Sequence, residues 1–96
     1  MNYIQQRETL ELIQMYNKAE NKKIIKRNLI DVFNKYKISK QDIITDLQEH
    51  PEKIGGWRNR ANENYIPTLE DALRLSIKYG FSMNDLLDGI ENEKIH

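Results

Sequence analysis

Basic side chains gather in the middle of the chain, where they could bind the phosphate groups of a nucleic acid. Residues 17–60 carry eleven Lys and Arg against six Asp and Glu, whereas residues 61–96 carry three basic and seven acidic residues. The formal net charge of the whole chain is zero, which hides this polarity. One side of the molecule is therefore expected to attract polyanions. An ordinary solvated helix surface would explain the same charges equally well.

No set of residues has the spacing of a catalytic or metal site. Asp42 and Asp46 share a helix face, as paired catalytic carboxylates would, but they fit exposed capping and surface acids better. His50 has only His96 as a second histidine and the chain has no Cys, so we expect no metal site. The sequence also lacks a glycine-rich phosphate loop and a base suited to a nucleophilic triad. We expect neither enzyme activity nor a cofactor.

Composition favours a small helical protein. A chain of 96 residues with four Gly, two Pro and 31% charged residues fits one mostly helical domain. No apolar run is long enough to span a membrane, and the first residues lack the basic and apolar segments of a signal peptide. The absence of Cys is consistent with a reducing compartment, so we expect a cytoplasmic protein.

Apolar residues recur at helical spacing over six segments. We expect helices over residues 3–19 and 23–36, from Ser39 to about Gln48, from His50-Pro51 to about residue 60, from Thr68 to Gly80, and from Ser82 to Gly89. Ser39, Thr68 and Ser82 each have an acidic residue three positions later, which predicts capping boxes. Gly80 suits a left-handed helix end, with Phe81 packing back on it. The predicted core face of the fifth helix contains Leu69, Ala72, Leu73, Leu75 and Ile77.

The helix that begins at Pro51 has an unusual composition. Ile54 and Trp57 lie one turn apart, so both are predicted to face the core, and Trp57 is not expected to stack on a base. Gly55 and Gly56 stand between them, and each costs about 1 kcal/mol relative to Ala inside a helix. We therefore expect a group to approach this backbone closely, or the helix to be irregular.

A longer pattern identifies a family resemblance. Ile38, Ile43, Leu47, Ile54 and Trp57 follow a known apolar spacing without a gap. The pattern closes with Ile66-Pro67-Thr68-Leu69 and with Tyr79-Gly80-Phe81-Ser82-Met83-Asn84-Asp85-Leu86-Leu87-Asp88-Gly89. With these runs, residues 25–89 resemble the lambda-repressor-like (Cro/repressor, XRE-type) helix-turn-helix domain, and Trp57-Arg58-Asn59-Arg60 is similar to temperate-phage immunity repressors. The resemblance implies an all-α, five-helix domain with an additional N-terminal helix.

The resemblance also implies a DNA-binding site on a recognition helix of about residues 51–60, lying in the major groove. Lys40 and Gln41 stand at the start of the third helix, where the family contacts a phosphate. His50 is placed to donate to a phosphate, Lys53 to reach a guanine edge or a phosphate, and Arg58 and Arg60 to contact the DNA backbone. Glu52 would repel phosphate unless it accepts a hydrogen bond from a cytosine amine. The candidate DNA-binding residues are Lys40, Gln41, His50, Glu52, Lys53, Gly56, Arg58 and Arg60. The residues expected to form a solvated face instead are Lys22, Lys23, Lys26 and Arg27.

Several residues depart from the family pattern. Pro51 and Gly56 stand at base-reading positions, although neither has a side chain that can read a base edge. Ile44 and Gln48 replace the usual Ala and Gly near the turn between the two helices. The bulk of Ile44 is expected to separate these helices or to change their crossing.

Residues outside the resemblance indicate how the chain is organised. We expect residues 1–22 to be an N-terminal helix, residues 23–89 the helix-turn-helix domain, and residues 90–96 a flexible tail. The stripe of Tyr3, Ile4, Leu10, Ile13 and Tyr16 predicts either a homodimer through residues 3–19 or packing of this helix on its own domain.

Two functions are consistent with these features. The first is a sequence-specific regulator that binds double-stranded DNA, of the phage or mobile-element repressor type. The second is a helix-turn-helix module that binds a protein regulator, as an antirepressor or adaptor does, and does not read DNA. Pro51, Glu52 and the two glycines favour the second function, whereas the basic middle segment favours the first.

Overall fold

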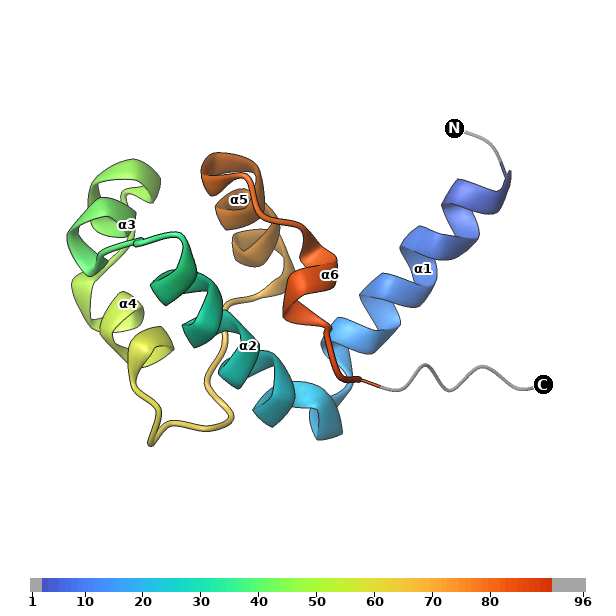
Figure 1. Cartoon of the computed structure of the whole chain (residues 1–96), viewed down its shortest axis with the longest axis horizontal. Helices are drawn as coiled ribbons and strands as arrows, with labels where there is room; N and C mark the ends of the chain where they lie inside the picture. Colours follow the sequence, from blue (N-terminus) through green and yellow to red (C-terminus); the bar gives the residue numbers. More distant parts are fainter. Residues whose placement is uncertain (1–2, 91–96) are drawn as a thin grey trace.

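The computed structural model describes residues 3–90, with side chains from Thr9 onward, and all regular secondary structure among these residues is helical (Figure 1). The expected all-α class is therefore confirmed for this part of the chain. The elements are α1 (Tyr3–Asn17), the short 3-10 helix η1 (Ala19–Asn21), α2 (Lys22–Lys35), α3 (Lys40–Leu47), α4 (Pro51–Arg58), α5 (Leu69–Tyr79) and α6 (Met83–Leu86). None of the described helices has the length and apolar character needed to cross a bilayer.

The core forms around α2, which contacts α1 and η1 near its N-terminus and packs along α6. Ile25, Leu29 and Phe33 of α2 are at most 1% exposed. On the other side of the molecule, α3 and α4 pack on each other (Figure 1). Ile54 and Trp57 of α4 have no exposed surface and belong to the same apolar cluster as α2, which confirms their predicted inward orientation.

Local side-chain chemistry sets the ends of the helices. Capping boxes at Ser39 and Ser82 begin α3 and α6, and the Thr68 hydroxyl accepts from the backbone N–H of Asp71 at the start of α5. Gly80 adopts the left-handed conformation (φ 81°) after α5, and Phe81 is buried directly after it. The boxes at Ser39 and Ser82 were predicted and are confirmed, but at Thr68 only the hydroxyl half of the predicted box forms, because the Asp71 carboxylate pairs with Lys53 and Arg74.

The first helix is shorter than expected. It ends at Asn17 rather than at residue 19, because Lys18 has an extended backbone (φ −75°, ψ 123°). The side-chain amide of Asn21 donates to the carbonyl of Met15 at 2.9 Å, so it binds one of the unpaired carbonyls at the end of α1. The chain therefore turns before α2, and the two helices are separate.

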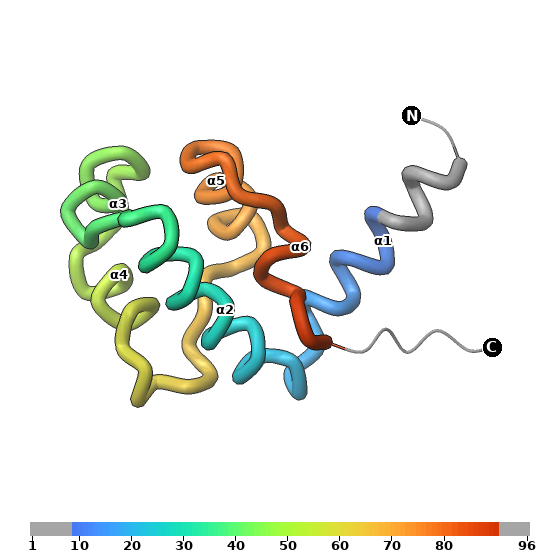
Figure 2. Tube along the Cα trace, viewed as in Figure 1, coloured from blue at the N-terminus to red at the C-terminus, as the bar shows by residue number. Residues whose placement is uncertain are grey.

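The C-terminal end of α1 lies beside the other helices (Figure 2). Tyr16 is 2% exposed and its hydroxyl donates to the Pro67 carbonyl at 2.8 Å, whereas Leu10 is 58% exposed. The side chains of Tyr3 and Ile4, and residues 91–96 of the expected tail, lie outside the described residues.

Two expectations about burial are wrong. On α5, Ala72 and Leu75 are fully buried, but Leu73 is 40% and Ile77 81% exposed. Leu73 follows Ala72 by one residue, which turns it about 100° around the helix and off the buried face. Conversely, Lys26 was expected in a solvated face and is only 3% exposed. Its long aliphatic stem lies in the core region while its ammonium reaches backbone carbonyls, as described below.

Candidate nucleic-acid interface

The two helices predicted to carry the interface are joined by a three-residue turn. α3 ends at Leu47 and α4 begins at Pro51, with Gln48, Glu49 and His50 between them. Gln48 has a left-handed backbone (φ 55°, ψ 41°), which costs a residue with a Cβ about 1–2 kcal/mol. A glycine would adopt this conformation without such a cost. Half-buried Ile44 packs against the core just before the turn.

The outer face of α4 carries almost no side chains. Ile54 and Trp57 occupy its inner face, so the 3.6-residue repeat puts Glu52, Gly55 and Gly56 on the opposite side. Pro51 and Glu52 are exposed in the first turn. The outermost surface of α4 therefore offers one functional group, the carboxylate of Glu52.

Neighbouring groups lie against both glycines, as the sequence predicted. A Cβ at Gly56 would lie 2.6 Å from Cδ2 of Tyr65, so the tyrosine ring rests directly on the helix backbone. A Cβ at Gly55 would lie 3.4 Å from Nζ of Lys40, which is an ordinary contact distance. Gly56 therefore lets Tyr65, from the segment after α4, come close to the helix, whereas the place of Lys40 beside Gly55 would also leave room for an alanine.

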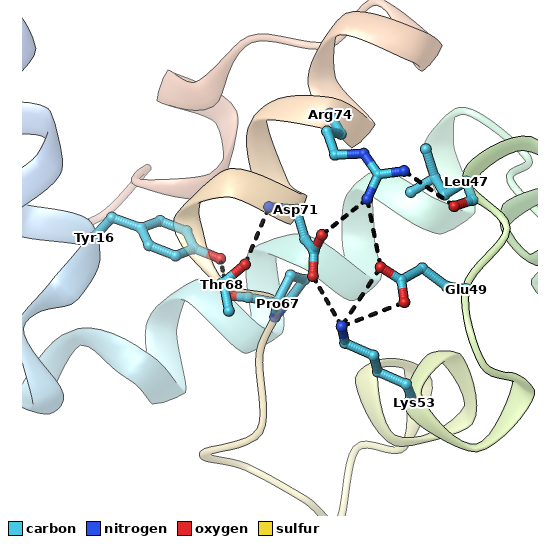
Figure 3. Close-up of polar contacts among 8 residues, drawn as sticks. All are labelled: Tyr16, Leu47, Glu49, Lys53, Pro67, Thr68, Asp71 and Arg74. Atoms are coloured by element: carbon cyan, nitrogen blue, oxygen red, sulfur yellow. Dashed lines mark hydrogen bonds and ion pairs between the residues drawn. The ribbon is translucent and has the colours of Figure 1, made fainter.

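Lys53 leaves the outer face and joins an ion-pair network with α5 (Figure 3). Its Nζ lies 3.2 Å from Asp71 Oδ2 and 3.3 Å from Glu49 Oε1. Arg74 Nη1 closes the network at 3.3 Å from Asp71 and 3.4 Å from Glu49, and its Nη2 donates to the Leu47 carbonyl at 3.0 Å. The hydrogen bond to Asp71 is the main reason that the pKa of Lys53 is raised. The predicted DNA contact of Lys53 thus competes with two carboxylates of its own chain.

The start of α5 is tied to α1 as well as to α4. Asp71 is 5% exposed, and Tyr16 reaches the carbonyl of Pro67 a few residues earlier (Figure 3). Burial, with a smaller contribution from the charge of Asp71, raises the pKa of the Tyr16 hydroxyl. The position of α4 on the core is therefore coupled to α5 and, through it, to α1.

Arg58 and Arg60 differ in their surroundings. Arg58 Nη1 donates to the Ile38 carbonyl at 2.8 Å, and its guanidinium lies 5.1 Å from the ring centre of Phe33. The helix expected to reach about residue 60 ends at Arg58, because Asn59 has an extended backbone (φ −85°, ψ 110°). Arg60 therefore projects from the segment after α4, where it is exposed.

Lys26 is a site residue that sequence reasoning missed. Its Nζ donates to the carbonyls of Gly56 at 2.7 Å and Tyr65 at 2.8 Å, and burial lowers its pKa. One buried ammonium therefore holds the last turn of α4 to the segment that follows it. A signal was present in the sequence: Ile30 and Phe33, four and seven residues later on the same side of α2, are both buried.

The remaining predicted site residues are exposed around α3 and α4. Gln41 donates to Thr45 within α3 at 3.3 Å, and His50 precedes α4 without a capping hydrogen bond from its side chain. Lys40 and Arg60 form no ion pair with any carboxylate in the described part of the chain. Among the predicted site residues, these two cations are therefore available to bind phosphate.

An open hollow of about 460 Å³ lies beside α4. It is lined by His50, Glu52, Lys53, Gly56, Asn62 and Tyr65. Four of these residues were predicted from the sequence as DNA contacts, and the structure brings them together. Asn62 and Tyr65 come from the segment between α4 and α5 and were not predicted.

Comparisons with known protein families, curated proteins and solved structures find no match to this chain. Over the residues whose side chains are described, no three His, Cys, Asp or Glu residues are grouped so that they could hold a metal ion.

Proposed function

We propose that the protein is a sequence-specific DNA-binding transcriptional regulator of the phage or mobile-element repressor type. α3, the turn at Gln48–His50 and α4 form its helix-turn-helix unit within a lambda-repressor-like domain, and α4 enters the major groove. The observation that carries the proposal is the setting of α4. Ile54 and Trp57 fix the helix from behind with no exposed surface. On the opposite side Glu52 is exposed, and Gly55 and Gly56 are partly exposed beside Lys40 and Tyr65.

Affinity for DNA comes from cations beside this helix. Lys40 at the start of α3 lies beside Gly55, Arg60 is exposed just past α4, and neither has an ion-pair partner in the described residues. Such cations bind phosphates and set affinity and register, whereas base contacts set specificity. Lys53 and Arg58 have a different role: they hold α4 to α5 and to the segment before α3.

A homodimer through residues 3–19 is part of this proposal. It would present two copies of α4 to half-sites about 34 Å apart, one turn of DNA. The exposed Leu10 supports a partner for the outer part of α1, whereas Tyr16 ties the other end of the helix to its own domain. Mass measurement of the full chain at tens of micromolar decides the matter, since a monomer at that concentration would contradict the dimer.

A protein-interaction module is the second candidate, favoured because the outer face of α4 carries few functional side chains. Glu52 is the one acidic group there, and the cations of Lys53 and Arg58 are directed inward. Such a surface would suit a protein regulator, because Glu52 repels phosphate.

A salt titration of binding to duplex DNA distinguishes the two functions. A DNA-binding protein loses affinity steeply as salt rises, and Lys40→Ala and Arg60→Ala should each reduce the slope of log K against log salt by about one. The control is Lys78→Ala, which removes an exposed cation from α5. Absence of binding to duplex DNA at low salt, or slopes unchanged in both site variants, would favour the protein-interaction module.

A further inference from the structure

The middle of α4 lacks the side chains that direct base reading requires. Base edges in the major groove are read by hydrogen-bonding side chains and by apolar contacts with the thymine methyl group. Gly55 and Gly56 supply neither, and Lys53 and Arg58 are directed elsewhere. If α4 faces DNA as proposed above, another part of the chain has to present chemistry at this point.

The segment after α4 occupies that place. The ring of Tyr65 rests on Gly56, and Asn62 lines the same hollow beside Glu52. Tyr65 is 42% exposed, so one part of its ring contacts the helix and another part faces outward. The surface beside the glycines is therefore made by Tyr65 and Asn62 instead of by side chains of α4.

Several contacts hold these two residues in place. The N–H of Asn62 donates to the Asn59 carbonyl at 3.0 Å, and the N–H of Tyr65 donates to the Asn62 carbonyl at 3.1 Å. The carbonyl of Tyr65 also accepts from the buried ammonium of Lys26 at 2.8 Å. Binding groups are most effective when a supporting shell fixes them before the ligand arrives. Lys26 provides such support as a positioning residue, out of reach of the ligand.

We propose that Asn62 and Tyr65 are the specificity-determining residues of the DNA interface, and that they read an A·T pair. This inference rests on the proposed DNA-binding function. The amide of Asn62 carries one donor and one acceptor, which match N6 and N7 of adenine in the major groove. The exposed part of the Tyr65 ring offers an apolar surface to the thymine methyl group.

Selection from a randomised double-stranded DNA library, read by sequencing, tests the proposal. The probes for affinity are then the most enriched duplex and a scrambled duplex of the same composition. Asn62→Ala should weaken binding to the enriched duplex about 5- to 150-fold and broaden the preference at one or two adjacent positions. Binding to the scrambled duplex and its salt dependence should not change, because phosphate contacts are retained.

Matched variants distinguish a loss of base recognition from a loss of the folded structure. Asn64→Ala removes an exposed amide from the same segment that does not line the hollow, and it should leave the preference unchanged. Tyr65→Phe keeps the ring and should keep the preference for A·T, whereas Tyr65→Ala should lose it. Far-UV circular dichroism of each variant shows whether the helices remain.

The outcomes distinguish this inference from the function on which it rests. If the wild-type protein binds no duplex at all, both are overturned. If it binds duplexes without preference, or if Asn62→Ala and Tyr65→Ala keep the wild-type preference, base reading by this segment is wrong while DNA binding stands. A preference at the affected position for G·C instead of A·T also contradicts the assignment.

Discussion

Gly55 and Gly56 are neighbours on α4, but replacing each by alanine should have different consequences for stability. Alanine in place of glycine inside a helix stabilises a protein by about 0.5–1 kcal/mol when the new methyl group has room. At Gly55 the methyl would meet the Lys40 ammonium at 3.4 Å, so Gly55→Ala should show most of this gain. At Gly56 it would lie 2.6 Å from a ring carbon of Tyr65, so the ring has to move.

The cost of moving the ring follows from its burial. Tyr65 is 42% exposed, so somewhat more than half of its surface is covered. Full burial of a large apolar side chain stabilises by about 1.5–3 kcal/mol, and displacing this half-covered ring should therefore cost about 1–1.5 kcal/mol. We expect Gly56→Ala to leave the free energy of unfolding unchanged or slightly lower, about 1–2 kcal/mol below that of Gly55→Ala.

Urea unfolding measures these differences, with fluorescence of the single, fully buried Trp57 as the probe and circular dichroism as a second signal. A double-mutant cycle with Tyr65→Ala isolates the contact. In the Tyr65→Ala background, Gly56→Ala should stabilise about as much as Gly55→Ala does. Equal stabilisation by the two alanines in the wild-type background would refute the close seating of Tyr65 on α4.

Three further changes test the elements that support α4. Gln48→Gly should raise the free energy of unfolding by about 1 kcal/mol in urea titrations, because the left-handed backbone at this position strains a residue with a Cβ; a loss would contradict that conformation. Asp71→Asn should lower the free energy of unfolding by about 1–2 kcal/mol, because it removes the buried carboxylate that pairs with Lys53 and Arg74. The control Asp31→Asn, on the exposed side of α2, should have little effect. Tyr16 has an ordinary pKa of 10.0 when unfolded and a raised pKa when folded, so the unfolded chain loses this proton first and stability falls as pH rises above about 10. Between pH 8 and 11 the free energy of unfolding of Tyr16→Phe should fall less steeply with pH than that of the wild-type protein, by up to about 1.4 kcal/mol per pH unit. An unchanged slope would contradict burial of the hydroxyl.

Features governed by neighbouring residues could be predicted from the sequence. Ser39 and Ser82 cap helices because their hydroxyls reach backbone amides two or three residues away. Gly80 ends α5 because it alone in that stretch adopts a positive φ without strain. The inward orientation of Ile54 and Trp57 follows from their spacing of three residues. Such interactions join residues within one helical turn, so they can be predicted from neighbouring residues in the sequence.

Features that depend on tertiary packing could be predicted less well from the sequence. Leu73 and Ile77 were predicted as core because they are apolar, but the width of the buried stripe on α5 depends on what packs against it. The spacing of Lys26 from Ile30 and Phe33 puts it on the buried side of α2, but the burial of a charged residue there depends on carbonyls 30 and 39 residues away in the chain. Buried polar groups of this kind require their partners to be known.

The candidate site was predicted in outline but not in its division of roles. The sequence pointed to Lys53 as a DNA contact because it lies in the first turn of α4. Its pairing with Asp71 joins residues far apart in the chain, and no local pattern indicates it. Tyr65 and Asn62 were missed for the same reason, although the glycines of α4 did predict that some group would come close.

Nuclear magnetic resonance of the glycine amides during titration with duplex DNA tests the central claim most directly. The chain has four glycines, of which Gly55 and Gly56 lie on the outer face of α4, while Gly80 and Gly89 follow α5 and α6. We predict that an enriched duplex shifts or broadens the signals of Gly55 and Gly56 and leaves those of Gly80 and Gly89 unchanged. DNA binding with no change at Gly55 and Gly56 would contradict the assignment of this face.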